Sequence, residues 1–369
     1  QIVVIVVIQR EICIKKFNVV RFIMELFISI VITVLVFSVV YDKLIKSMIN
    51  KKIKCLMELD SQEGHEKDTF TLVVTVTNNS ILPISTIRTE VHLPDGLEFV
   101  TDFGADADEH GRYICSPLPD SKKTISTKWS VKATKRGEYI FDHITIIRQF
   151  PFGRKKEQID LSLSNPQKLS IHPYLIDLGN WFSDSETSIN KTILKNSSET
   201  TVILNMQSRS REQNFYNIAH PEAVDMCVNS ASSFLEELKR LNISTSLLSN
   251  GLYENIDNEY KVHTRNGYLT YIPHKNDDEL FNASQYLMKT KNEITTETYE
   301  MLRMISKNSE NFNLSQSIII ITAYLDSFFL DFYNEMISRG KKVVFCIVSP
   351  QSEIPVFPLE APVFYLENR

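Results

Sequence analysis

The pattern of apolar and polar positions changes twice along this chain of 369 residues. Residues 22–41 form a nearly continuous apolar run in which Glu25 is the single charge. From about residue 53 to 172 apolar and polar residues alternate with a period of two, and after residue 199 short apolar runs alternate with stretches of helical period. The pattern therefore predicts three parts and a linker: a membrane anchor over 1–50, a β-sandwich over 53–175, a linker over 176–198 and an α/β domain over 199–369.

The first apolar run has the length of a membrane span. About 20 predominantly apolar residues are enough for a helix to cross the hydrocarbon core of a bilayer. The residues Val39-Val40-Tyr41-Asp42 after it do not resemble a signal-peptide cleavage site. We therefore predict that residues 22–41 bind the lipid bilayer of a cell membrane, and the alternative is a helix buried in a protein core.

The flanks of this run bear on its orientation. Slightly more basic residues follow the run than precede it, which favours a cytoplasmic body under the positive-inside rule. They are Arg10, Lys15, Lys16 and Arg21 before it, and Lys43, Lys46, Lys51, Lys52 and Lys54 after it. Residues 2–8 are apolar but too few to cross a bilayer. They represent either the tail of a truncated first span, which makes a two-pass protein, or an artificial start, which leaves a single pass.

The alternating region predicts an antiparallel, immunoglobulin-like β-sandwich. In Thr69–Val76 one face holds Phe70, Leu72, Val74 and Val76, and similar runs recur over 87–93, 125–131 and 139–147. Turn-forming residues separate these runs: Asn78-Asn79-Ser80, Pro94-Asp95-Gly96 and Lys135-Arg136-Gly137. Short alternating strands at this spacing, with no helical stretch between them, are typical of a sandwich. Arg136 is a candidate for partner binding, although a turn that needs Gly137 at positive φ explains the same residues.

The last part alternates strand with helix, which predicts a Rossmann-like α/β domain with a mostly parallel sheet and right-handed crossovers. The expected strands are 200–204, 243–248, 317–322 and 342–348, and the expected helices are 222–241, 277–290, 297–307 and 327–339. Residues 318–321 are four consecutive isoleucines, which is typical of a strand buried on both faces.

Composition and motifs exclude several classes of function. A net charge of −5 gives no basic excess for nucleic-acid binding. The five cysteines are scattered, without a Cys-x-x-Cys pair, so neither a disulfide framework nor a zinc site is expected. The chain holds no Gly-x-Gly-x-x-Gly, Gly-Lys-Ser/Thr or Gly-x-Ser-x-Gly sequence. We therefore expect no cofactor and no enzymatic activity.

Polar residues follow two of the expected parallel strands, where ligands of such sheets usually bind. Ser208 and Ser210 follow the first strand, and Thr322 and Asp326 follow the central one. Their oxygens could serve a hard cation or a protein partner. However, Asn205 occupies the place where an acid would help most, and Arg209 would repel a cation. The sequence therefore predicts loop capping and partner binding at Ser208, Ser210 and Asp326, without a metal.

Four motifs together give the chain a resemblance to a known family. They are Asn78-Asn79 with Leu82-Pro83, then Lys135-Arg136-Gly137-Glu138-Tyr139, then Phe150-Pro151-Phe152-Gly153, and finally His172-Pro173. In this order and spacing they resemble the bacterial family catalogued as domain of unknown function 58. The resemblance spans roughly residues 22–369 and implies an anchor, a β-sandwich and a von Willebrand factor A-like domain, in that order.

The chain departs from that family at two places. The family's Gly-Asp, Arg-x-Ile-His-Trp-Lys and Ala-Arg signature is missing before the first α/β strand. The family's metal-ion-dependent adhesion motif maps onto Asn205, Gln207, Arg209, Thr322 and Ala323, where most of its acids and small hydroxyls are replaced. The resemblance implies a MoxR-type AAA+ ATPase as partner, in envelope assembly or stress. The leading hypothesis is thus a membrane-anchored scaffold or adaptor, and the alternative is a metal-dependent adhesion module or envelope enzyme.

Overall fold

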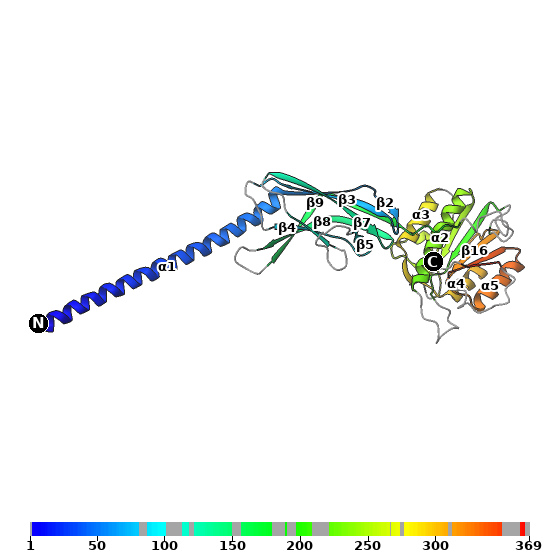
Figure 1. The fold of residues 1–369 in the computed structure, drawn as a ribbon. Helices are drawn as coiled ribbons and strands as arrows, with labels where there is room; N and C mark the ends of the chain where they lie inside the picture. The colour runs from blue at the N-terminus through cyan, green and yellow to red at the C-terminus, as the bar shows by residue number, and fades with distance from the viewer. Residues whose placement is uncertain are drawn as a thin grey trace.

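The computed structural model describes residues 2–80, 87–100, 113–117, 122–149, 156–178, 189, 197–208, 221–265, 267–273, 277–308, 312–348 and 362–365. A long helix, a β-sandwich and an α/β domain follow one another along a line (Figure 1). We call the α/β domain the head. The head therefore lies at the end of the sandwich opposite the helix.

The helix α1 (Ile2–Lys52) contains the expected apolar run as an exposed surface. Its segment Arg21–Tyr41 is long and apolar enough to cross a membrane, and 0% of it is buried within the protein. Phe27 and Phe37 are 66% and 69% exposed. Arg21 donates a hydrogen bond of 2.9 Å from Nε to Oε1 of Glu25, so the one acid of the run is paired near its end. Residues 2–8 belong to the same helix.

The helix passes into the sandwich without a linker. α1 ends at Lys52 and strand β1 begins at Ile53. The backbone N–H of Asn79 donates to the carbonyl oxygen of Lys52 over 2.9 Å, which ties the helix end to the adjacent strand. The direction of the helix is therefore coupled to the sandwich.

Two sheets form the sandwich. One has the order β1-β3-β7-β5, and the other has the order β2-β9-β8-β4-β6. Their strands are β1 (Ile53–Leu59), β2 (Glu63–His65), β3 (Thr69–Asn78), β4 (Ile87–His92), β5 (Leu97–Phe99), β6 (Tyr113–Pro117), β7 (Lys123–Ala133), β8 (Gly137–Gln149) and β9 (Lys156–His172). All described pairings are antiparallel except β2 with β9. The prediction of an antiparallel β-sandwich is thus confirmed.

The side chains of β3 alternate between a buried apolar face and a polar face, as the period-two pattern predicted. Phe70, Leu72, Val74 and Val76 are buried in the core between the sheets. On the opposite face, hydroxyl groups bond across the strands, with 2.7 Å between Thr75 Oγ1 and Ser126 Oγ. Burial of the apolar face sets the register, because a slip of one residue would move it into solvent.

The head contains a seven-stranded sheet of order β13-β14-β11-β10-β16-β17-β18 among the described residues. The five strands from β11 to β18 are parallel, whereas β14 pairs antiparallel with both β11 and β13 and so runs against the other strands. The order β14-β11-β10-β16-β17-β18 is the 3-2-1-4-5-6 order of doubly wound sheets. The strands are β10 (Glu199–Leu204), β11 (Ser244–Ser249), β13 (Lys261–His263), β14 (Tyr268–Ile272), β16 (Ser317–Thr322), β17 (Lys342–Ile347) and β18 (Val363–Tyr365).

Helices cover both faces of this sheet. α2 (Pro221–Arg240) and α3 (Asp277–Lys289) lie on one side, and α4 (Thr298–Lys307) and α5 (Ser327–Ser338) lie on the other (Figure 1). A short 3-10 helix, η2 (Asn258–Tyr260), and a two-stranded sheet of β12 (Gly251–Leu252) and β15 (Lys291–Ile294) complete the head. The predicted α/β domain with a mostly parallel sheet is confirmed.

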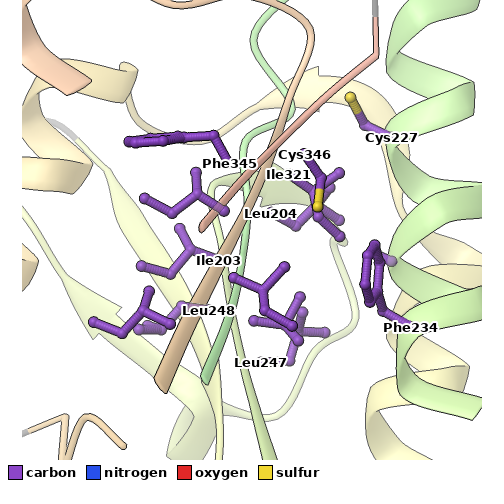
Figure 2. Close-up of a cluster of buried hydrophobic side chains, with 14 of the residues drawn as sticks. Ile203, Leu204, Cys227, Phe234, Leu247, Leu248, Ile321, Phe345 and Cys346 are labelled. Atoms are coloured by element: carbon purple, nitrogen blue, oxygen red, sulfur yellow. The ribbon is translucent and has the colours of Figure 1, made fainter. Parts of the chain in front are cut away.

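Alternate residues of the central strands supply two cores. Cys346 lies on the side of Cys227 and Phe234 from α2, whereas Phe345 points to the opposite side (Figure 2). There Phe345 packs edge-on against Phe329 of α5, with 6.0 Å between ring centroids. Because both faces are covered, every residue of β16 is buried.

Part of the segment predicted as a linker packs into the head. Leu178 is 5% exposed and Ile189 is 0% exposed, and both belong to the core of the head. The rest of 179–196 lies outside the described residues. These two side chains therefore extend the head before β10.

Candidate functional site

The carboxyl ends of the central strands bring four chain segments together. Asn205 follows β10, Asn250 follows β11, and Thr322 ends β16. β10 lies between β11 and β16, and all three strands are parallel, so their ends meet at one edge. Thr298, the first residue of α4, reaches the same place. This edge is the switch point of the sheet, where chain connections leave in opposite directions.

Asn205 is the centre of a hydrogen-bonded cluster. Its side chain is 0% exposed, and its Nδ2 donates to Thr322 Oγ1 over 3.0 Å. Its Oδ1 accepts from Asn250 Nδ2 at 3.2 Å and from the backbone N–H of Gln207 at 3.2 Å. The hydroxyl of Thr298 lies 2.7 Å from the same Oδ1. The amide of Asn205 is thus satisfied by the protein itself.

A second layer of hydrogen bonds closes this cluster. Tyr324 donates from its hydroxyl to Thr298 Oγ1 over 2.8 Å, and the backbone N–H of Thr298 donates to Gln207 Oε1 over 2.9 Å. Burial raises the pKa of Tyr324, and the neighbouring Asp326 carboxylate raises it further. Tyr324 is therefore a neutral hydrogen-bond donor at physiological pH. We call Asn205, Gln207, Asn250, Thr298, Thr322 and Tyr324 the strand-end cluster.

Asp326 lies beside the cluster but serves the start of a helix. Its side chain is 4% exposed and accepts from the backbone N–H of Phe329 over 3.4 Å, as the N-cap of α5. A carboxylate at this position is stabilised by the free N–H groups and by the dipole of the helix. Asp326 thus caps the start of α5, which is the loop-capping role that the sequence predicted for it.

The residues present do not fit a metal ion. Hard cations need several converging oxygens, carboxylates above all. Asn205 directs an N–H toward Thr322, and the other members of the cluster are also neutral. In the part of the chain that the structure describes, no three His, Cys, Asp or Glu side chains are arranged to hold a metal. Of the positions onto which the family resemblance maps an adhesion motif, Asn205, Gln207 and Thr322 belong to this neutral network, and Ala323 is buried.

The remaining candidates of this edge divide into two groups. Ser208 is described and half-buried next to the cluster, so partner binding there stays a prediction. Arg209 and Ser210 lie outside the described residues. Thr298, Asn250 and Tyr324 were not among the sequence candidates. The sequence signal that could have identified them is their position next to the end of a predicted strand or the start of a predicted helix.

Arg136, the candidate for partner binding in the sandwich, has its side-chain contacts within the chain itself. Its side chain is 7% exposed, between the sandwich and the head. Nη1 donates to Asp225 Oδ1 of α2 over 2.6 Å, and Nη2 donates to Asn292 Oδ1 over 2.7 Å and to the Thr290 carbonyl over 3.3 Å. The guanidinium is thus already engaged within the chain. Gly137 has a φ of 146°, as the turn required.

Further contacts surround Arg136 and hold the two domains together. Lys289 of α3 lies 3.1 Å from Glu138 of β8. Hydrogen bonds to Lys168 and Lys289 lower the pKa of Glu138. After β9, the backbone N–H groups of Tyr174 and Ile176 donate to Asn229 Oδ1 and Ser233 Oγ of α2, over 3.1 and 2.7 Å. We call this set of contacts, with Arg136 at its centre, the joint.

Two histidines lie at the edge of the joint. His65 and His172 face each other across β2 and β9, with 5.9 Å between ring centroids. His172 Nδ1 is also 3.3 Å from Ser284 Oγ of α3. Burial lowers the pKa of His172, and His65 lowers it further, whereas Glu63 and Glu236 oppose the shift. The neutral form of His172 is therefore favoured in the folded chain.

Comparison with known proteins gives only distant likenesses. No protein-family model matches the chain, and no curated protein matches it. Among solved structures, the N-terminal domain of an adhesin from Streptococcus gordonii has 10% identity and a TM-score of 0.25, over 33% of each chain. A type II cohesin domain from the cellulosome of Acetivibrio cellulolyticus has 12% identity and a TM-score of 0.23, over 32% of this chain and 95% of the domain. Likenesses of this size carry no argument about function.

Proposed function

We propose that this protein is a membrane-anchored protein-interaction scaffold. The observation that carries this proposal is the apolar segment Arg21–Tyr41, of which 0% is buried within the protein. An exposed apolar surface of this size is not stable in water and marks a membrane or protein contact. A helix satisfies its own backbone hydrogen bonds, so it can cross the hydrocarbon core.

The body fits a binding role better than a catalytic one. The strand-end cluster is neutral, and its described polar groups bond to one another. Next to it, the rings of Tyr299 and Phe328 lie 5.7 Å apart and are partly exposed. Aromatic side chains are enriched at protein interfaces. We therefore place the partner at the carboxyl edge of the head, over Tyr299, Phe328 and Ser208.

The partner that we propose is a MoxR-type AAA+ ATPase, with the body in the cytoplasm. Support comes from the resemblance to the domain of unknown function 58 family and from the greater number of basic residues after the span. The sheet order with one antiparallel strand, β14, is consistent with a von Willebrand factor A-like head. No observation favours the metal-dependent alternative, because the strand-end cluster does not fit a metal.

Site-specific photocrosslinking in native membranes tests this function. A photoreactive amino acid replaces Tyr299 or Phe328 in the full-length chain, and a control chain carries it at Leu56, which is 40% exposed on the sandwich. We expect an AAA+ ATPase to be captured from the two head positions and not from Leu56. Capture of cell-wall or secreted proteins would contradict a cytoplasmic body. Equal capture from all three positions would contradict docking at the head.

A further inference from the structure

Basic residues gather at the end of the sandwich that faces the membrane span. Lys54 of β1 and Lys123 of β7 are brought to this end by β3, which pairs with both strands. Among the side chains that the structure describes, the first two residues of β1 and β7 and the last two of β3 include no acid.

The opposite end of the sandwich has the reverse charge. Near the head, the strand ends of β1, β5 and β8 contain Glu58, Glu98 and Glu138, and that of β7 contains Lys132. The sandwich is therefore electrically polar along its long axis, and its positive end follows α1. Positive and negative side chains are thus separated along the sandwich and not mixed over its surface.

Exposed lysines extend this positive end on two segments that are distant in sequence. Lys51 and Lys52 end α1, and Lys122 lies in the turn before β7. With Lys54 and Lys123 they form a set of five exposed lysines, which we call the basic collar. The pairing of Ile53 with Asn78, and of Asn78 with Lys123, holds the two segments next to each other.

The basic collar lies within electrostatic reach of a bilayer surface. Eleven residues of α1 separate Tyr41 from the end of the helix at Lys52, which corresponds to about 16 Å at 1.5 Å per residue. The headgroup layer occupies roughly 5–7 Å of that distance. The remaining gap is close to the Debye length of about 8 Å at physiological salt. Polybasic segments next to a span are attracted to anionic lipid over this range.

We propose that the basic collar binds the anionic headgroups of the membrane that α1 crosses. The contact draws the sandwich toward the surface, and the stiff passage from α1 into β1 transmits the resulting tilt to the head. The position of the head above the membrane then depends on the anionic lipid content. This proposal rests on the proposed anchoring by α1, and the two are separated in the test below.

Energy transfer in reconstituted vesicles tests the contact. The full-length chain carries a donor dye on a click-reactive amino acid at Asn79, which is exposed at the same end, and the acceptor dye is on lipid headgroups. We expect transfer to be higher with phosphatidylglycerol in phosphatidylcholine than with phosphatidylcholine alone. The difference should disappear in 1 M salt, where the Debye length is about 3 Å.

Two variants, each of which loses five lysine charges, show whether the basic collar causes the dependence of energy transfer on anionic lipid. Replacement of the five collar lysines by Gln should abolish the dependence on anionic lipid. The control replaces five exposed lysines elsewhere, which are Lys128, Lys132, Lys239, Lys307 and Lys342. The control should retain the full dependence of energy transfer on anionic lipid. Loss of this dependence in both variants, or in neither variant, would overturn the proposal. Flotation with phosphatidylcholine vesicles reports anchoring separately, because neutral lipid does not attract the collar.

Discussion

The joint and the strand-end cluster are both polar networks, but they differ in charge and in burial. Arg136, Asp225, Glu138 and Lys289 give the joint ionised partners from two domains. The strand-end cluster consists of amides and hydroxyls within one domain. Charge-assisted hydrogen bonds are roughly twice as strong as neutral ones. The chain thus uses charge to connect its domains and a neutral network to close the edge of its sheet.

The largest effect should come from removing the centre of the neutral cluster. Asn205→Leu leaves the Thr298 and Thr322 hydroxyls and the Asn250 amide without their shared partner. These groups keep other partners in Thr296, Gln207 and Tyr324, so the cost is that of the four hydrogen bonds to Asn205. At about 0.5–1.5 kcal/mol for each bond, we expect the head to lose roughly 3 kcal/mol or more of unfolding free energy. Urea denaturation followed by circular dichroism measures this loss. Ser208→Ala, at a half-buried neighbouring position, should stay within about 0.5 kcal/mol.

A smaller loss is expected from breaking the charged network. Arg136→Ala removes the contacts with Asp225, Asn292 and the Thr290 carbonyl. Because Asp225 is 43% exposed and remains solvated, we expect a cost of about 1–3 kcal/mol rather than that of a fully buried pair. Hydrogen exchange should accelerate in the first turns of α2 and in β15, without a change in the sheet of the head.

The control for Arg136 is Arg240, whose guanidinium is 69% exposed and pairs with Glu237. Arg240→Ala should leave the unfolding free energy and the exchange at the joint unchanged, because an exposed ion pair is screened by solvent. Equal effects of the two variants would show that the joint does not depend on the buried position of Arg136.

Acid should weaken the joint and spare the strand-end cluster. The pKa of His172 is lowered in the folded chain, so its contribution to stability is complete above the unfolded pKa of about 6.5. That contribution is lost as the pH falls through the lower folded pKa, because protonation places a charge at a partly buried position beside His65. We expect thermal stability to fall between pH 7 and pH 5 in the wild type and to fall less in His172→Gln. An unchanged pH profile in the variant would contradict this assignment.

The smallest effect should come from the more exposed pair of the joint. In Lys289→Gln, Glu138 keeps its contact with Lys168 at 2.8 Å. Partly exposed pairs contribute about 0.2–1 kcal/mol, and salt screens them. The loss measured by urea denaturation should shrink in 1 M salt, whereas the effect of Asn205→Leu should not. A salt-independent loss at Lys289 would show that packing, not charge, sets its contribution.

The local pattern predicted the five α-helices and eight of the eighteen strands among the described residues. The alternation in β3 and the four isoleucines of β16 correspond to observed strands. β9 was not predicted, because Asn165 and Pro166 interrupt its alternation with turn-forming residues. The strands β13 and β14 were also missed, since three to five residues are too few for a clear period.

The polar networks could be predicted only in part. The positions of Asn205 and Thr322 after parallel strands indicated that they would meet. The joint gave no such signal, because Arg136 and its partner Asp225 are 89 residues apart and belong to different domains. A Lys-Arg-Gly turn looks the same in sequence whether its arginine meets solvent, a second protein or a neighbouring domain. Tertiary structure alone separates these cases.

Extraction of membranes shows whether residues 21–41 anchor the body in a bilayer. Membranes from cells that make the full-length chain are washed with alkaline carbonate, and the retained protein is analysed by peptide mass spectrometry. The account predicts that the body stays in the membrane fraction and still contains the peptides of Arg21–Tyr41. Release of the body by carbonate, or recovery of a body that lacks this segment, would contradict it.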